Sequence, residues 1–387
     1  MPIVNKHVRL LTTQYIGTRR SALHKGVCPN LSTNWLRIKM NNQRKDILLD
    51  LLRTPSPSGS ESDIIYKVAG YLRGNVDEIC RDVYGNLIAI KRGKTDTKLM
   101  LTAHADEVGM MVTYIDENGF LYFQEIGGID TNLLLGQRVE IHNDKGMVLG
   151  VIGKKPIHLQ GRDAKAKDYD AEDLWIDIAA KDKKDAESRV EVGDYITYQT
   201  QPTILHGESW ISKSLDDKVG LYTLIKVAEA LKDKKPKMDV YFVASVQEEL
   251  GARGVRTATM SIEPDYGIAI DVTHATDYPT CSPQKSGEIK LGSGIVIAKG
   301  PNIDPVMGRK LIDLAKQYEI KYQIEPIALP TGTDANFMQV SGKGVKTALL
   351  SIPCRYMHSP NEIVSLVDVN EGVRLLTLFC DVNLDKY

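Results

Sequence analysis

Val240-Tyr-Phe-Val-Ala-Ser-Val-Gln-Glu-Glu-Leu-Gly251 is the stretch of this sequence that decides the fold. Its apolar first half predicts a buried strand, and two adjacent acids, Glu248 and Glu249, follow that strand directly. Two carboxylates this close resist joint ionisation, and burial adds the cost of taking charge out of water. A cation would relieve both costs, so the pair predicts a metal site in which one acid binds the ion and the other handles a proton. Taken alone, the pair would also suit the first turn of a following helix, where the helix dipole favours acids.

Helical and strand patterns alternate on both sides of this stretch. Their apolar periods predict helices over 42–53, 217–233, 305–318 and beyond 368, and strands over 86–91, 98–103, 239–246, 266–271 and 346–352. Between about residues 109 and 200, short apolar runs are instead separated by turn signals such as Asn143-Asp-Lys-Gly146. The sequence therefore predicts an α/β sandwich that is interrupted by a small all-β barrel.

The expected domains follow from this change of pattern. A basic N-terminal extension spans 1–39, the two parts of the α/β domain span 40–108 and 206–387, and the barrel spans 109–205. The extension contains no Asp or Glu, and its basic composition suits a transit segment. The alternative that we favour is a mis-called start with Met40 as the true first residue, because a helical pattern begins directly after it.

Overall composition limits the classes of partner. The chain has 387 residues, more than one domain usually holds, and its 42% apolar and 26% charged residues are ordinary for a globular protein. A formal net charge of −1 argues against a nucleic-acid partner, and no apolar stretch approaches the length of a membrane span. The five cysteines are scattered and include no CxxC pair, which argues against a thiolate zinc site and favours a reducing cytoplasm.

Ionisable side chains recur after apolar strands or in turns in five short segments. These segments are Ala103-His-Ala-Asp106, Leu215-Asp-Asp217, Gln247-Glu-Glu249, Ile270-Asp-Val272 and Met357-His-Ser359. Two imidazoles and three carboxylates without a thiolate suit two divalent ions that share a bridging carboxylate. His104 and Asp106 are two residues apart on an extended segment and share a face, so Asp106 can hold the second ring nitrogen of His104.

The motif set resembles the M42 family of dinuclear metallo-aminopeptidases from about residue 40 to the C-terminus. The motifs that carry the resemblance are AHADEVG, SLDDKVG, VQEELGARG, the Asp of AIDV, GPNIDP, GTDA and RYMHSPNE. The resemblance implies a three-layer α/β/α zinc-peptidase-like catalytic domain with an inserted barrel. It also implies two divalent ions per subunit (Zn, Co or Mn), peptide substrates that lose their N-terminal residue, and a homo-oligomer such as a dodecamer that assembles through the barrel.

The resemblance also assigns roles to residues. It makes Glu248 the general base and Asp106 the partner of His104. Metal binding falls to five residues, with Asp216 bridging both ions, His104 and Asp271 completing one site, and Glu249 and His358 completing the other. Where the family often has Arg at the third position of the bridging motif, this chain has Asp216-Asp-Lys218, and Asp217 stays a competing candidate for the bridge.

Two other functions remain open at this point. M20-type amide deacylases and carboxypeptidases share the ligand order, but their extra domain lies between the late Asp and the last His. Here the long gap lies between His104 and Asp216, which favours the M42 pattern. A glycan-processing protein is the third possibility, but glycosidases use two carboxylates and no metal, so the complete ligand set argues against it.

Overall fold

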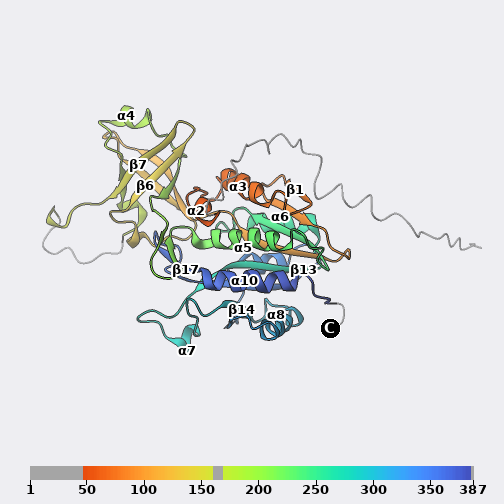
Figure 1. Ribbon diagram of the computed structural model, residues 1–387. Coiled ribbons are helices and arrows are strands. Elements are labelled where there is room, and N and C mark those ends of the chain that lie inside the picture. Colours follow the sequence, from red (N-terminus) through yellow and green to blue (C-terminus); the bar gives the residue numbers. More distant parts are fainter. Residues whose placement is uncertain (1–46, 160–168, 385–387) are drawn as a thin grey trace, which may run out of the picture.

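The computed structural model describes residues 47–159 and 169–384, so the N-terminal extension expected over 1–39 lies outside the described residues. Figure 1 shows a larger α/β body and a smaller β-barrel that projects from one end of it. Among the helices of the described residues, none combines the length and hydrophobicity that a membrane crossing requires.

A mixed sheet forms the centre of the α/β body, with eleven strands within the described ranges. Its strands are β1 (Glu78–Arg81), β2 (Leu87–Lys91), β3 (Lys98–His104), β10 (Thr203–Ile204), β11 (Ser209–Ser212), β12 (Asp239–Ser245), β13 (Tyr266–His274), β14 (Ile295–Lys299), β15 (Tyr322–Pro326), β16 (Lys346–Arg355) and β17 (Glu362–Ser365). The main path runs β1-β2-β12-β3-β13-β16-β17-β11-β10, and β14 joins β16 to β15. Strands β12, β3, β13 and β16 run parallel to one another, so their carboxyl ends meet at one edge of the sheet.

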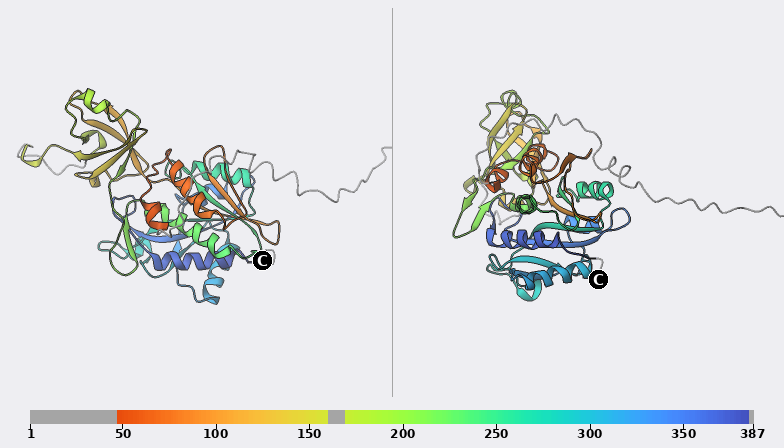
Figure 2. Two further views of the ribbon diagram at one scale, coloured as in Figure 1. Left: turned by 45° about the horizontal axis from the view of Figure 1, so that its top comes forward. Right: turned by 45° about the vertical axis from the view of Figure 1, so that its right-hand side comes forward.

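Helices cover both faces of this sheet and complete the three layers. The helices of the described residues are α2 (Ile47–Leu52), α3 (Ser62–Leu72), α4 (Lys183–Glu187), α5 (Leu215–Leu231), α6 (Arg253–Ile262), α7 (Pro283–Ser286), α8 (Pro305–Gln317), α9 (Asp334–Gln339) and α10 (Leu366–Phe379). Helices α5 and α10 pack side by side on one face, and α6 packs with α9 on the other (Figure 2). The central strands are almost wholly apolar and buried, as expected for a parallel sheet that is covered on both faces.

The barrel is built from a separate set of strands. It closes in the order β4-β5-β8-β7-β6-β9. These strands are β4 (Gly109–Ile115), β5 (Leu121–Ile126), β6 (Arg138–Asn143), β7 (Gly146–Gly153), β8 (Trp175–Asp177) and β9 (Tyr195–Tyr198). They enclose an apolar core of their own that includes Val112, Ile141 and Ile196. The predicted turn at Asn143-Asp-Lys-Gly146 joins β6 to β7, where Gly146 has a positive φ of 132°.

The predicted fold class, an α/β/α domain with an inserted small barrel, is confirmed. All barrel strands fall inside the span expected for the barrel, although the division of the chain into domains stays a prediction. Helix α5 begins at Leu215, earlier than the predicted start, and its first turn is irregular because Asp216 and Asp217 have non-helical dihedral angles. Several shorter strands outside the central part of the sheet, among them β10, β11, β14 and β17, were not predicted.

Candidate metal centre

The carboxyl edge of the parallel strands collects the residues that the sequence analysis singled out. His104 is the last residue of β3, Asp271 lies near the end of β13, and Glu248 and Glu249 follow β12. Register brings Ser245 of β12 beside His104 of β3, so the segments after these strands begin at the same level. Asp216 comes to this edge at the irregular start of α5, and His358 follows β16.

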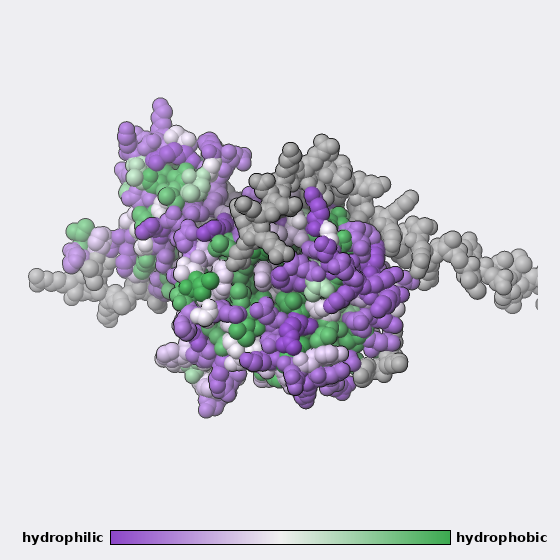
Figure 3. Space-filling model, viewed as in Figure 1, coloured by the Kyte–Doolittle hydropathy of each residue, from purple (hydrophilic) through white to green (hydrophobic). Residues whose placement is uncertain are grey.

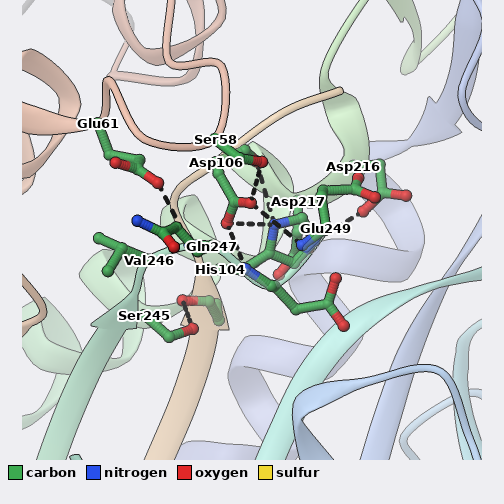
Figure 4. A network of polar contacts seen from close by, with 12 residues as sticks. Ser58, Glu61, His104, Asp106, Asp216, Asp217, Ser245, Val246, Gln247 and Glu249 are labelled. Carbon is green, nitrogen blue, oxygen red and sulfur yellow. Dashed lines mark hydrogen bonds and ion pairs between the residues drawn. The ribbon is translucent and has the colours of Figure 1, made fainter. Parts of the chain in front are cut away.

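Five of these side chains form two adjoining donor groups that share Asp216. His104, Asp216 and Asp271 place one ligand atom each within 4.8 Å of one another, and so do Asp216, Glu249 and His358. The two oxygens of Asp216 face different imidazoles: Oδ1 lies 2.9 Å from His104 Nε2, and Oδ2 lies 3.2 Å from His358 Nε2. Figure 4 shows Asp216, Glu249 and His104 converging in this way. An acid common to both groups is the geometry expected of a bridging ligand.

The second nitrogen of each imidazole is fixed by a backbone oxygen. His104 Nδ1 donates to the carbonyl oxygen of Asp106 at 3.0 Å, and His358 Nδ1 donates to that of Gly128 at 2.8 Å. Such bonds set the tautomer, because Nε2 is then the nitrogen that can offer a lone pair to a metal ion. Gly128 lies in the turn after β5, so the barrel orients a side chain of the site.

Burial makes the negative charge of this site costly. Loss of hydration, reinforced by the charge of Asp216, raises the pKa of Asp271 well above its usual range. Burial together with the charges of Asp271 and Asp334 does the same to the pKa of Glu248, although His104 opposes the shift. At this site, crowded and desolvated carboxylates point with imidazole nitrogens at a common centre. Divalent ions of borderline softness prefer such a set of donors. The residues present therefore fit a pair of metal ions.

Asp106 lies beside His104, with its Oδ1 3.5 Å from His104 Nδ1, and its carboxylate has further partners. Oδ1 accepts the backbone N–H of Glu248 at 2.9 Å, and Oδ2 accepts that of Glu249 at 3.1 Å. The hydroxyl of Ser58 donates to Oδ2 at 2.7 Å (Figure 4). Burial alone would raise the pKa of Asp106, but its bonds with His104 and with these donors lower it. This acid therefore holds the Glu248–Glu249 segment in place as well as the imidazole.

A buried ion network that the sequence analysis missed lies next to the site. Glu107 pairs with Lys213 and, at 3.0 Å, with Lys218, and it also accepts the backbone N–H of Ser56 at 2.8 Å. Burial by itself would raise the pKa of Glu107. The two nearby lysines together have the larger effect and lower this pKa to about 2. Burial lowers the pKa of Lys218 to about 7, since its contact with Glu107 offsets only part of the lost hydration. The network ties the segment after β3 to β11 and α5.

Glu362 is a second buried acid without a predicted role. Its side chain accepts the backbone N–H groups of both Asp216 and His358. The adjacency of Glu107 to Asp106, and the place of Glu362 inside the motif RYMHSPNE, are the signals that could have drawn attention to the two acids. Neither signal identifies the long-range contacts, because Lys213 and Lys218 lie 106 and 111 residues from Glu107, and Asp216 lies 146 residues from Glu362.

The side chains of Asp217, Thr333 and Arg355 have partners of their own. Asp217 belongs to neither donor group among the described residues, and its Oδ1 accepts the backbone N–H of Gly220 at 3.0 Å. Thr333 caps α9 by accepting the backbone N–H of Ala335. Arg355 forms an ion pair with Asp277 at 2.7 Å.

A covered sheet with parallel central strands, and with two adjoining imidazole–carboxylate groups at their carboxyl ends, defines an α/β/α metallohydrolase, here with a barrel inserted after β3. Comparison with known proteins gives the family. The model of the M42 glutamyl aminopeptidase family matches residues 85–375, and this chain belongs to that family.

Individual relatives agree with the family. The chain is 38% identical over 336 residues to a lysyl aminopeptidase of Pyrococcus furiosus, across 85% of this chain and 94% of the relative. Its fold is similar to that of an aminopeptidase from the archaeon Desulfurococcus kamchatkensis, with a TM-score of 0.83, 34% identity and coverage of 88% and 96% of the two chains. It is also similar to the TET1 peptidase of Pyrococcus horikoshii, with a TM-score of 0.77, 32% identity and coverage of 86% and 98%.

The comparisons identify the chain as a metal-dependent aminopeptidase of the M42 type, as the motifs predicted. They give no support to the M20-type alternative. The roles assigned to the individual site residues stay predictions.

Proposed function

We propose that this enzyme is a dinuclear metallo-aminopeptidase that cleaves the N-terminal residue from peptides with Glu248 as general base. The observation that carries the proposal is the pair of donor groups joined by Asp216. His104, Asp216 and Asp271 would hold one divalent ion, and Asp216, Glu249 and His358 would hold the other. Zinc, cobalt and manganese all suit this mixture of imidazole and carboxylate ligands. When bound, two such ions lower the pKa of a water molecule from ~15.7 toward ~7 and polarise a peptide carbonyl.

Glu248 is the acid of the central pair that neither donor group includes. It is buried beside Glu249, and its backbone N–H is held by Asp106, so its position relative to the donor groups is fixed. As general base it would take a proton from the attacking water and return that proton to the amine that leaves. Its neighbour Glu249 keeps the role of ligand, so the two acids divide the work.

The restriction to N-terminal residues would come from recognition of the substrate's free amine by a metal ion or by a nearby acid. A free α-ammonium group of the substrate would be stabilised by nearby carboxylates, whereas an acylated nitrogen carries no charge to pair with them.

Hydrolysis of a free-amine chromogenic amino-acid amide, compared with its N-acetylated form, tests this function. We expect the enzyme to cleave the free-amine substrate only, to lose activity on chelation, and to regain it with zinc, cobalt or manganese. Equal cleavage of the acetylated substrate would indicate a deacylase instead. Activity that survives complete metal removal would reject the two-metal mechanism altogether.

The barrel supports a second part of the proposal, assembly into a homo-oligomer. Met147, Leu149 and Val151 alternate along β7 and are 52%, 52% and 41% exposed. An apolar patch is visible on the barrel in Figure 3. Rows of exposed apolar residues commonly mark protein–protein contacts. The TET1 peptidase of Pyrococcus horikoshii can assemble into a tetrahedron or a large octahedral shell. We propose a related assembly here, and a dodecamer is one form of it.

We also propose that the enzyme is located in the cytoplasm.

A further inference from the structure

Glu362 has a place in the fold that connects the two donor groups. It is the first residue of β17, which lies between β16 and β11. Strand β16 leads into the segment that carries His358, and β11 leads into the segment that carries Asp216. A side chain at this position can therefore reach the backbone of both ligand-bearing segments.

The contacts of Glu362 use both carboxylate oxygens. Oε1 accepts the N–H of His358 at 2.9 Å, and Oε2 accepts the N–H of Asp216 at 3.0 Å. Its side chain is 1% exposed, so water cannot replace either bond. Both N–H groups lie where regular structure offers no partner, because Asp216 is at the irregular start of α5 and His358 has a positive φ of 60°.

Asp106 shows the same arrangement at a different pair of site residues. Its two oxygens accept the N–H groups of Glu248 and Glu249, as those of Glu362 accept the N–H groups of Asp216 and His358. Two buried acids thus fix the backbone of four site residues.

We propose that Glu362 is a positioning residue that sets the distance between Asp216 and His358, and with it the binding of both metal ions. The inference rests on the proposed function, in which Asp216 bridges the ions. The ion held by Asp216, Glu249 and His358 should depend on Glu362 more strongly, because two of its three ligands are anchored by this acid. The ion held by His104, Asp216 and Asp271 has one such ligand.

The variant Glu362→Gln tests the proposal, because its amide replaces one acceptor with a donor and must lose one of the two bonds. Binding of Zn²⁺ to the metal-free protein, measured by chelator competition, should weaken by about 10–100-fold for at least one ion. The absorption spectrum of the Co²⁺-loaded protein should change as the ligand geometry changes. The shorter acid in Glu362→Asp cannot span both N–H groups and should weaken binding in the same way.

Asp368→Asn is the matched control. Asp368 is a buried acid that accepts two backbone N–H groups, of Gly292 at 2.7 Å and Gly294 at 2.6 Å, and it belongs to neither donor group. Its variant should lose thermal stability while metal affinity and the Co²⁺ spectrum stay as in the parent.

Four outcomes decide whether Glu362 positions the metal ligands. Parent-like Zn²⁺ affinity and Co²⁺ spectra in both Glu362 variants would overturn the proposal, and so would a failure of both variants to fold, since Glu362 would then serve the fold alone. A parent protein that binds no divalent ion would instead reject the proposed function. Weakened binding in the Glu362 variants, with a parent-like Asp368→Asn, supports the inference.

Discussion

At the scale of single residues, the adjacent acids Glu248 and Glu249 have different surroundings. Glu249 Oε1 lies 3.3 Å from Nε2 of His358, within one donor group, whereas Glu248 belongs to neither group. Asp106 holds the backbone of both through its two oxygens. The division of labour that the sequence suggested, with one acid for the metal and one for the proton, is therefore compatible with the geometry.

Replacing Glu248 with Gln should separate the two roles. The amide keeps the size of the side chain but cannot accept a proton from water, so we expect kcat to fall by about 10²–10⁴-fold. Metal content, measured by elemental analysis, should stay close to that of the parent, whereas Glu249→Gln should lose metal as well as activity. Retention of a large part of the activity by Glu248→Gln would show that another group takes the proton.

The predicted ligands could be found from the sequence because each lies near or after the end of an apolar strand, or at the start of a helix. That position is visible locally, and parallel strands bring such positions to one edge. Glu362 could not be found in this way, since its contact with Asp216 spans 146 residues and its contact with His358 depends on the local turn. Gly128 was missed for the same reason, because it enters the site from the barrel.

At the scale of elements, the buried network of Glu107, Lys213 and Lys218 joins β11, α5 and the segment after β3. The pKa of Glu107 is lowered to about 2 in the folded chain. A carboxyl whose folded pKa is depressed adds stability above its unfolded pKa and loses that stability as the pH falls through the folded value. The contribution of Glu107 should therefore be complete above about pH 4.5 and vanish as the pH falls toward 2.

Glu107→Gln tests this network. Removing one partner of a buried ion pair leaves uncompensated charge, so we expect a loss of about 3–5 kcal/mol in the free energy of unfolding at pH 7. Deprotonation of Lys218, whose pKa is about 7, would relieve part of that loss. Urea denaturation between pH 7 and 3 should show a shallower pH dependence in the variant.

The surface pair of Glu191 and Lys145 provides the control for this experiment. Glu191→Gln makes the same change of charge in an exposed pair and should leave the free energy of unfolding near that of the parent. If Glu107→Gln behaves like Glu191→Gln, the buried network does not stabilise the fold.

The central strands and main helices were predictable because their apolar periods are long and continuous. The shorter strands were not predictable, since β10 has two residues and β17 has four, and runs this short carry little periodicity. The order of the strands in the sheet could not be predicted from the sequence pattern either. Strand β12 lies between β2 and β3, although β2 and β3 are neighbours in the chain.

At the scale of the whole molecule, the barrel has an exposed apolar row on β7 that the α/β body does not cover. If this row is a subunit contact, Leu149→Lys should place charge in the contact and reduce the size of the assembly. Size-exclusion chromatography with light scattering should then show a large parent assembly and smaller species for Leu149→Lys.

Met260→Lys is the control for assembly, because Met260 is 64% exposed on α6 of the α/β body. We expect this variant to keep the parent's size. A monomeric parent would refute assembly, and a Leu149→Lys variant of unchanged size would place the contact elsewhere.

The central claim is that two metal ions share Asp216, and anomalous scattering from crystals of the Zn²⁺-loaded enzyme tests it most directly. The account predicts two anomalous peaks, one among His104, Asp216 and Asp271 and the other among Asp216, Glu249 and His358. A single peak, or two peaks that do not both contact Asp216, would contradict it.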